Sequence, residues 1–408
     1  MTTNEPSHQR KRLLVLTSTF PRWEGDSEPP FVFELCRRLG ADFDVWVLAP
    51  HAPGAKTHET MSGLTVVRFR YFFEWGETLA YQGGILANLR NNQLRYLLVP
   101  WFLACQLVAL LRLLARERFD IVHAHWLIPQ GLVAVAARLL SRRAPALLCT
   151  AHGSDLHGLR GALFSALKRL VISRSDAVSM VSQAMKEHAV ALGAESEKIS
   201  VISMGVDTAN TFMPAEHPSR SNDELLFVGR LTAQKGVELL VRAMPRIVKN
   251  HPTTILSVVG RGPHEKSLRA LSEALGVARN VTFLGAIANE KLPELYRRAA
   301  VLVFPSATEE GFGLVCVEAL ACECPVIASD LPAMKEIVLN SETGLLFKRG
   351  DSDELAHKIL ALLADPVLRY SMGKAGREFV SQRFDWQIIA QRYGDLLTRS
   401  IAMKDQGQ

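Results

Sequence analysis

Residues 301–329 read VLVFPSATEEGFGLVCVEALACECPVIAS, and this stretch contains a complete structural unit. Four apolar residues end at Pro305 and are followed by a loop with two glycines. An apolar stretch from Leu314 to Leu320 comes next, and a second short apolar run occupies 326–329. A strand, a loop, a helix and a strand in this order form the βαβ unit of a parallel sheet. The stretch therefore predicts an α/β fold.

The same alternation of short apolar runs and longer helical patterns extends over the whole chain. We expect strands at 13–17, 45–48, 64–69, 121–124, 146–150, 177–181 and 199–202 in the first half, and at 225–228, 254–259, 281–284, 301–304 and 326–329 in the second. The segment 207–223 contains Pro214 and Pro218 but no apolar period, which is typical of a linker. The sequence thus predicts two Rossmann-like, doubly wound domains, 1–207 and 208–384, that face each other across a cleft. Helical periodicity over 385–400 predicts a last helix that packs back on the first domain.

Composition restricts the partners and the compartment. Of the 408 residues 48% are hydrophobic, and the net charge of +6 lies in the first half, where residues 1–204 have 23 Lys and Arg against 17 Asp and Glu. This excess favours an anionic partner for the first domain, and the alternative is a set of scattered, solvated arginines. The excess is mild and no nucleic-acid motif accompanies it, which argues against nucleic acid.

The polar N-terminus lacks a signal-peptide core, and the six cysteines form no disulfide pattern, so we expect a cytoplasmic protein with reduced cysteines.

Two loops in the second half have the composition of an anion site. Gly229 permits a tight turn after a strand, and Arg230 and Lys235 place two cations near the next helix N-terminus. In the second loop, glycines allow a ligand to approach the backbone, and N–H groups at the start of a helix point toward an anion. The residues concerned there are Gly311, Phe312, Gly313 and Leu314. Solvated loop cations are the alternative for the first loop.

Two glutamates accompany the second loop. Glu310 precedes the helix, and Glu318 lies within its apolar stretch, where burial of an unpaired carboxylate is costly. The paired hydroxyls of a ribose would supply donors to Glu318; a surface-helix glutamate is the alternative. Eight residues of helix span about 12 Å, which is longer than the roughly 5 to 9.5 Å that separates the two carboxylates of glycoside hydrolases. The spacing therefore fits a hydrolase poorly.

The segment EGFGLVCVEALACECPVIASD at 310–330, preceded by VGRLTAQKG at 228–236 and VVGRGPHEKSL at 258–268, resembles the retaining GT-B glycosyltransferases of group 1, also called family 4. The resemblance implies that the second domain binds a UDP- or GDP-sugar. It assigns Glu318 to the donor ribose and Glu310 to hydroxyls of the transferred sugar. Further residues that it assigns are Arg230 and Lys235, to the diphosphate, and Gly260, near the nucleoside. Glu323 departs from the family, which usually has glycine there.

Polar residues also end two neighbouring strands of the first half, where His123 and His125 close one strand and His152 and Asp155 follow the next. They predict a site, although a structural hydrogen-bonding role is the alternative for each histidine, and their spacing does not suit a metal. The resemblance places His125, and less readily His123, near the transferred sugar, and His152 and Asp155 beside the acceptor. Relatives have a Gly-Gly pair near the donor phosphate, whereas this chain has only Gly25, followed by Pro29 and Pro30.

The resemblance implies a hexosyl transfer with retention to a glycan or a polyprenyl- or other lipid-linked acceptor, in cell-surface polysaccharide or glycolipid synthesis. It implies front-face displacement without a cofactor or a metal. The pairs Asp42/Asp44 and Asp351/Asp353 match a metal-binding DxD only superficially, since the first leads into a strand and the second starts a helix as a cap. Two alternatives are a nucleotide-sugar 2-epimerase of the same architecture and a membrane-docking protein with a vestigial nucleotide site.

The run 97–111 is apolar except for Gln106. Fifteen residues are fewer than the roughly 20 that span a bilayer, so we expect no transmembrane helix. The run is either a buried helix or a helix in a membrane interface on the cytoplasmic face. Between 60 and 118 there are seven arginines against three acidic residues, and the arginines are Arg68, Arg70, Arg90, Arg95, Arg112, Arg116 and Arg118.

Overall fold

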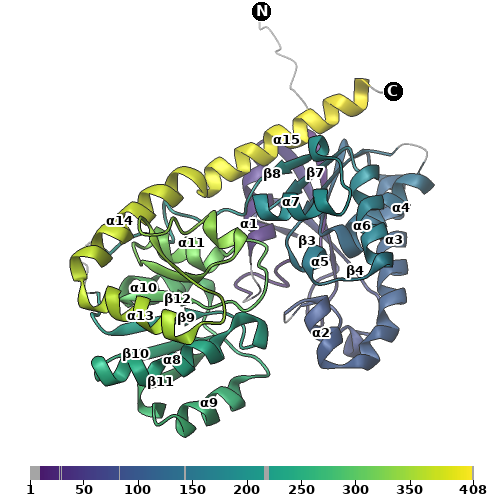
Figure 1. Ribbon diagram of the computed structural model, residues 1–408. Coiled ribbons are helices and arrows are strands. Elements are labelled where there is room, and N and C mark those ends of the chain that lie inside the picture. The colour runs from purple at the N-terminus through teal and green to yellow at the C-terminus, as the bar shows by residue number, and fades with distance from the viewer. Residues whose placement is uncertain are drawn as a thin grey trace, which may run out of the picture. The chain divides into compact units, whose positions relative to one another are not determined.

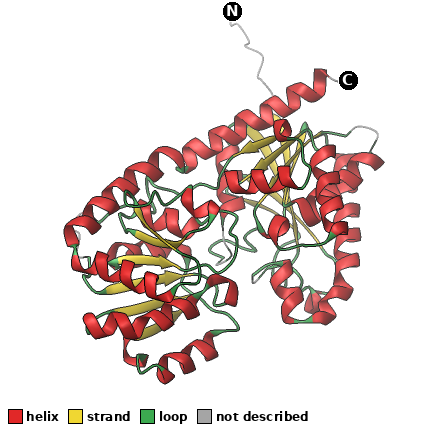
Figure 2. Cartoon of the chain, viewed as in Figure 1, coloured by secondary structure: helices red, strands yellow, loops and turns green. Residues whose placement is uncertain are grey.

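The computed structural model describes residues 10–26, 28, 30–81, 83–141, 144–215 and 220–406. Pro29 and Pro218, and most of the polar N-terminus, lie outside the described residues. The chain divides into two compact units (Figure 1). Unit 1 contains the residues up to Val181, Met185–Ile202 and those from Ala390 onward, and unit 2 contains Ser182–Ala184 and Ser203–Ile389. Each unit has a sheet with helices packed around it (Figure 2).

Unit 1 has an eight-stranded sheet in the order β3-β4-β2-β1-β5-β6-β7-β8. Its strands are β1 (Lys11–Leu16), β2 (Phe43–Pro50), β3 (His58–Met61), β4 (Leu64–Phe69), β5 (Ile121–His125), β6 (Ala146–Ala151), β7 (Ala177–Met180) and β8 (Ile199–Val201). Only β3 is antiparallel to its neighbour. The helices in this part of the chain are α1 (Phe31–Leu39), α2 (Ile85–Asn91), α3 (Leu98–Arg116), α4 (Leu132–Leu140), α5 (Ser154–His157), α6 (Ala162–Arg174) and α7 (Gln183–Ala191).

Unit 2 has a six-stranded parallel sheet in the order β11-β10-β9-β12-β13-β14, the doubly wound order of dinucleotide-binding folds. Its strands are β9 (Glu224–Val228), β10 (Ile255–Val259), β11 (Val281–Gly285), β12 (Val301–Phe304), β13 (Val326–Ser329) and β14 (Gly344–Phe347). The helices are α8 (Val237–Asn250), α9 (Glu265–Ala274), α10 (Leu292–Arg298), α11 (Leu314–Ala321), α12 (Pro332–Lys335), α13 (Ser352–Ala364) and α14 (Pro366–Arg383). The strand order reverses between β10-β9 and β12, so the carboxyl ends of β9 and β12 flank the place where such folds bind ligands.

The sequence pattern located every strand of both sheets except β3 and β14. β3 is the polar stretch HETM at a sheet edge, where one face is in solvent and no apolar run is required. β14 is the four-residue stretch GLLF, which is too short to show a period. The first sheet is consequently mixed rather than purely parallel.

The apolar run 97–111 was placed correctly in a helix, but the helix is longer than the run and the buried alternative was wrong. The helix α3 continues to Arg116, and the helical segment Gln93–Arg116 is long and apolar enough to cross a membrane by length and composition. It is not a buried helix either, since only 17% of its apolar window is buried. A single face, formed by Phe102, Gln106 and Leu110, is buried, and Phe102 contacts Phe69 of β4. On the rest of the segment Leu97, Trp101 and Val108 are exposed, and most other apolar side chains are partly covered.

The last helix, α15 (Trp386–Gln406), extends further than the sequence period suggested. Its first residues belong to unit 2, where Trp386 lies against Gly205, and a Cβ at Gly205 would be 2.4 Å from the indole. From Ala390 onward it belongs to unit 1. There the fully buried Tyr393 lies beside the ring of His123, with 5.6 Å between centroids.

Candidate functional site

The loops that follow β9 and β10 in unit 2 touch through two glycines. Gly260 has a φ of +131°, and a Cβ placed on it would lie 1.9 Å from the carbonyl oxygen of Gly229. The N–H group of Gly229 donates to the carbonyl of Val259 at 3.0 Å. A side chain at Gly260 would therefore push the first loop away from the end of the sheet. Arg230 is exposed in this loop, next to Gly229.

The loop after β9 is also joined to the loop after β12. Gly236 has a φ of +66°, and a Cβ on it would lie 1.8 Å from the carbonyl oxygen of Pro305. The carbonyl of Gln234 accepts from the N–H of Ala307 at 2.8 Å, and Ser306 Oγ lies 3.1 Å from the same oxygen. These contacts fix the two loops that the sequence predicts as an anion site against each other.

At this junction Lys235 and Glu310, which are 75 residues apart in the sequence, form an ion pair. Lys235 Nζ is 2.8 Å from Oε1 and 3.0 Å from Oε2 of Glu310, and Ser306 Oγ donates to Oε1 at 2.5 Å. The two side chains are 22% and 16% exposed, so they are packed yet reachable by a ligand. Lys235 Nζ also lies 5.2 Å from the centroid of Phe304, at the end of β12. The structure thus brings together the cation and the carboxylate that the sequence assigned to one substrate.

The glycine-rich segment after Glu310 leads into the N-terminus of α11. Gly313 has a φ of +147°, and a Cβ on it would be 2.6 Å from Met334 Cε, so glycine is required at this N-cap. The Phe312 ring is buried against Phe384, which leaves the backbone as the ligand-facing part of this residue. Gly311, Gly313 and Leu314 are partly exposed. The first N–H groups of a helix have no partner within it, so this segment can bind an anion.

Glu318 is buried, with 7% exposed surface, so the surface-helix alternative is wrong. Burial raises the pKa of its carboxyl, and hydrogen bonds from Tyr296 and Asn289 counteract this rise. The Tyr296 hydroxyl donates to Oε2 at 2.8 Å, and Asn289 Nδ2 donates to Oε1 at 3.3 Å. Sequence reasoning missed these two donors, which come from α10 and from the turn before it. A carboxylate accepts about four hydrogen bonds, so acceptor capacity remains for a ligand.

Glu323, where the family usually has glycine, lies in the turn after α11. Glu323 follows α11 with a φ of +59°, the left-handed region that favours glycine. Its carbonyl oxygen lies against Gly373 of α14, where a Cβ would be 2.1 Å away. The strain therefore lies on the side of α11 that packs on α14.

In unit 1, the four predicted polar residues lie together, and all except the partly exposed His152 are buried. His123 and His125 are fully buried, with ring centroids 4.2 Å apart. His125 Nδ1 is 2.9 Å from His152 Nε2, and the ring of His152 packs between Trp126 and Phe31. Burial lowers the pKa of His123 and of His152 to about 3, and that of His125 is also lowered by burial. The three imidazoles are therefore neutral at pH 7.

Asp155 holds the loop in which it lies. Its carboxylate accepts from the backbone N–H groups of Leu127 at 2.7 Å, of Gly153 at 3.1 Å and of His152 at 3.2 Å. Burial raises the pKa of Asp155, and these hydrogen bonds lower it. By contrast, Gly25 is exposed with a φ of +78°, and no atom lies within 4 Å of a Cβ built on it. The structure does not bring Gly25 into the histidine cluster.

The two DxD-like pairs have structural partners. Asp44 bonds to Arg12 Nε at 2.9 Å, and Asp351 caps α13 by accepting from the N–H groups of Asp353 and Glu354. Among the residues that the structure describes, no three His, Cys, Asp or Glu side chains are grouped so as to hold a metal ion. Metal independence itself stays a prediction.

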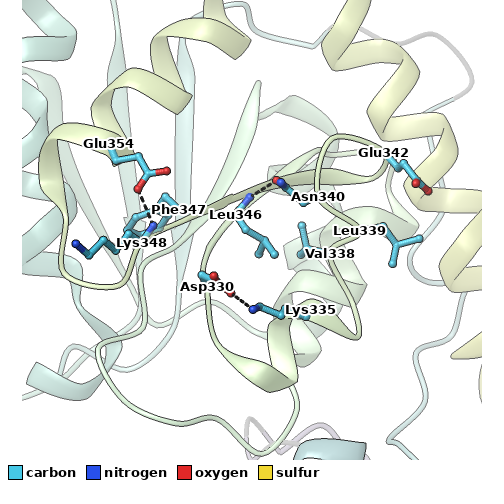
Figure 3. Close-up of a pocket in the computed structure, with 10 residues that line it drawn as sticks. All are labelled: Asp330, Lys335, Val338, Leu339, Asn340, Glu342, Leu346, Phe347, Lys348 and Glu354. Carbon is cyan, nitrogen blue, oxygen red and sulfur yellow. Dashed lines mark hydrogen bonds and ion pairs between the residues drawn. The ribbon is translucent and has the colours of Figure 1, made fainter.

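A hollow of about 540 Å³ opens at the ends of β13 and β14 (Figure 3). Lys335 of α12 and Asp330, which follows β13, form an ion pair of 2.9 Å beside it. None of the predicted site residues lines this hollow, which is shallow and open on the surface of unit 2.

Comparison with known proteins agrees with this geometry. Residues 210–379 match the family described as glycosyl transferases group 1, and residues 30–210 match glycosyltransferase family 4. The glycogen synthase of Mycobacterium tuberculosis is 32% identical over 278 residues, which are 67% of each chain. This chain belongs to the group 1, family 4 glycosyltransferases.

The glycosyltransferase is also similar to a lipid-modifying relative. The GDP-mannose-dependent alpha-(1-6)-phosphatidylinositol monomannoside mannosyltransferase of M. tuberculosis is 30% identical over 305 residues, 71% of this chain and 78% of that protein. Among solved structures, sucrose-phosphate synthase from Thermosynechococcus elongatus superposes with a TM-score of 0.79 at 24% identity, over 97% of this chain and all of that one. Anabaena Alr3699/HepE in complex with UDP-glucose gives a TM-score of 0.73 at 19% identity, over 95% and 99% of the two chains. These likenesses establish the GT-B fold.

Proposed function

We propose that this glycosyltransferase moves a hexosyl unit from a UDP- or GDP-sugar to a glycan or lipid-linked acceptor with retention of configuration, in cell-surface polysaccharide or glycolipid synthesis. The observation that carries the proposal is the Lys235–Glu310 pair, held beside the glycine-rich N-terminus of α11 at the reversal point of the sheet. Diphosphate needs cations and N–H donors, and a sugar needs a carboxylate that accepts from its hydroxyls. These groups are adjacent here.

The proposed chemistry depends on stabilisation of the leaving group. Negative charge develops on the diphosphate as its bond to the sugar breaks, and Lys235, Arg230 and the α11 N–H groups would stabilise that charge. The leaving oxygen takes the proton of the acceptor hydroxyl on the same face of the sugar. Because the charge is balanced by these groups, this step requires no divalent metal. His125 and His152 would contribute neutral imidazoles to sugar and acceptor recognition in unit 1.

Glu318 would bind the ribose of the donor. Its carboxylate is already held by Tyr296 and Asn289, which fixes its orientation before a ligand arrives. Gly260 would act indirectly, because its lack of a side chain lets the Gly229 loop lie against it at the ends of β9 and β10, where the nucleoside would bind. Pre-organised groups lose little conformational entropy when a ligand binds.

The test is a donor screen followed by product analysis. UDP, GDP and ADP are compared by thermal shift, since a ligand at 100 times its dissociation constant stabilises by about 2.7 kcal/mol. The protein is then incubated with UDP-glucose and with GDP-mannose alone. Slow release of nucleoside diphosphate, with an α-linked product once an acceptor is added, supports the proposal. An epimerised donor would instead indicate a 2-epimerase, and absence of nucleotide binding would indicate a vestigial site.

For the acceptor, we propose a lipid-linked molecule and docking of unit 1 on an anionic membrane face on the cytoplasmic side. The supporting observation is the exposed apolar surface of α3 and of the turn before it, where Trp101 is 60% and Leu97 is 72% exposed. Sequence reasoning missed a second part of this surface, the stacked rings of Phe73 and Trp75, which are 69% and 79% exposed. Their loop is adjacent to α3, since Tyr71 packs on Phe102 with 5.1 Å between ring centroids.

The arginines near this surface are not all available. Arg68 is buried and donates to the carbonyls of Pro21 and Lys56, so its inclusion among membrane-facing arginines was wrong. Arg90, Arg112 and Arg116 are exposed on α2 and α3. Apolar surface with flanking cations is the composition of an interfacial segment.

A further inference from the structure

A chain of buried hydroxyl groups connects the last helix of unit 1 to the histidine cluster. Tyr393 of α15 donates to the carbonyl of Ile202 at 3.2 Å, and Ser179 of β7 donates to the Tyr393 oxygen at 3.5 Å. Ser179 Oγ lies 2.5 Å from Thr150 Oγ1 of β6, which lies 2.7 Å from His123 Nε2. All four side chains are fully buried. The chain thus contains four contacts, each of which needs one hydrogen.

The hydrogens can be counted. The three hydroxyl groups of Tyr393, Ser179 and Thr150 supply one hydrogen each, and the Ile202 carbonyl can only accept. With one hydrogen in each contact, the fourth comes from His123 Nε2. If Thr150 donated to His123 instead, the 3.5 Å contact between Ser179 and Tyr393 would lack a hydrogen, and the His123 N–H would lie on Nδ1, which is buried and has no partner among the described residues. An unsatisfied buried N–H group is costly. Burial raises the pKa of Tyr393 to about 12 and lowers that of His123 to about 3, so the phenol keeps its hydrogen and the imidazole has only one.

We propose that Tyr393 is a positioning residue that holds His123, through Ser179 and Thr150, in the tautomer with hydrogen on Nε2 and a lone pair on Nδ1. His123 Nδ1 is a buried atom for which the described residues provide no hydrogen-bond partner. It belongs to a ring that lies 4.2 Å from that of His125, whose Nε2 likewise has no partner among the described residues. The α15 helix therefore sets the hydrogen-bonding character of the cluster, because the tautomer of an imidazole is decided by the bond that its other nitrogen makes.

The effect on catalysis rests on the proposed function, in which His125 contacts the transferred sugar. Because the rings of His123 and His125 are in contact, a fixed His123 ring also fixes the position of the His125 ring. When His123 is no longer held in one tautomer, we expect kcat to fall about tenfold, as when a functional histidine loses the hydrogen-bond partner of its other nitrogen. We expect KM to change by no more than about twofold.

The experiment is nitrogen NMR of the full chain labelled at histidine, in wild type and in five variants. The His123 signals are assigned by their loss in His123→Asn. In the wild type we expect a protonated Nε2 and an unprotonated Nδ1 for His123. Tyr393→Phe removes two contacts, to Ile202 and to Ser179, together with one hydrogen. Two hydroxyl hydrogens then remain for two contacts, so Thr150 can donate to His123 and a mixture of tautomers should appear. Ser179→Ala should have the same effect and serves if Tyr393→Phe does not fold.

Two controls keep the test specific. Thr150→Ser retains the hydroxyl and should retain the wild-type tautomer. Tyr81→Phe removes a buried hydroxyl of unit 1 that donates to the Pro50 carbonyl outside this chain, and it should leave His123 unchanged. A wild-type His123 with hydrogen on Nδ1, or unchanged His123 nitrogens in both Tyr393→Phe and Ser179→Ala, would overturn the proposal. Because these spectra do not depend on turnover, failure of sugar transfer would count against the proposed function alone.

Discussion

The donor loops of unit 2 and the histidine cluster of unit 1 follow the same strand position, the first strand beyond the reversal of each sheet, yet they are built in opposite ways. Glu310 follows β12 in a loop defined by glycines, and it forms a partly exposed ion pair with Lys235. His123 and His125 end β5 fully buried and neutral, connected by hydrogen bonds and ring contacts. The same position in the fold thus supports a partly exposed charged pair in one unit and a buried, neutral polar cluster in the other.

The largest effect should come from the charged pair. Lys235→Ala and Glu310→Ala should each reduce kcat by roughly 10²- to 10³-fold, because each removes a group that stabilises developing charge or holds the sugar. The measurement is nucleoside diphosphate release under saturating donor. The matched control is Lys335→Ala, which breaks the ion pair with Asp330 in the same unit and should leave turnover near that of the wild type. Near-normal rates in both Lys235→Ala and Glu310→Ala with unchanged melting would disprove the donor site.

Next comes the backbone contact that joins the donor loops. Gly236→Ala should destabilise unit 2 and weaken nucleotide binding, because its Cβ would collide with the carbonyl of Pro305. Gly276→Ala is matched in conformation, with a φ of +70° against +66°, but has open space around its Cβ. The control should cost about 1–2 kcal/mol for its left-handed backbone alone. Urea unfolding of both variants measures the difference, and equal losses would show that the loop contact contributes nothing.

The histidine cluster should make stability depend on pH. Burial depresses the folded pKa of His123 and His152 to about 3, below the unfolded value of about 6.5, so protons bind preferentially to the unfolded chain. Their stabilising contribution is complete above about pH 6.5 and is lost as the pH falls toward 3, by about 1.4 kcal/mol per pH unit for each histidine. The raised pKa of Asp155 and of Glu318 acts in the opposite direction.

Comparison of variants separates the effect of the histidines from the opposite effect of Asp155 and Glu318. His152→Gln should show a smaller loss of unfolding free energy between pH 7 and pH 5 than the wild type, measured by urea titration at both values. His357→Gln, at an exposed position of α13, should leave the slope unchanged. If the unfolding free energy depends on pH identically in all three proteins, His152 binds a proton as readily in the folded as in the unfolded chain.

The exposed face of α3 should bind anionic vesicles through a few charges. Each suitably placed cation adds about 1 kcal/mol of attraction near such a surface. Charge reversal at Arg90, Arg112 and Arg116 should therefore lower co-sedimentation with anionic vesicles, and the difference should shrink in high salt. Reversal of the exposed cations Lys249, Lys266 and Arg279 of unit 2 should change binding little. The proposal of membrane docking would be wrong if both charge reversals lowered vesicle binding equally, or if the wild type did not bind vesicles.

The smallest expected effect is that of chelation. Transfer should persist in EDTA after dialysis, because cations of the protein and helix N–H groups stabilise the leaving diphosphate in the proposed step. Loss of activity with full recovery on Mg²⁺ or Mn²⁺ would replace that step by a metal-dependent one.

The sequence by itself determined the α/β class and almost every strand, and it located the two glycine-containing loops after β9 and β12. The binding of a sugar donor by these loops stays a prediction. Hydrophobic periodicity, strand length and glycine positions are local properties of the sequence. The spacing of Glu310 and Glu318 can likewise be read within one short motif. The same reasoning could not find Tyr296 and Asn289, the partners of Glu318, because they come from a different helix and turn whose sequence shows no motif.

Tertiary structure decided burial and pairing. The pattern of α3 is equally compatible with a core helix and a surface helix, and only packing on β4 showed which face is covered. Likewise, the histidines end strands in the sequence, but only the approach of α15 showed that Tyr393 lies against His123. Contacts between residues hundreds of positions apart depend on how sheets and helices stack, and no local period encodes that arrangement.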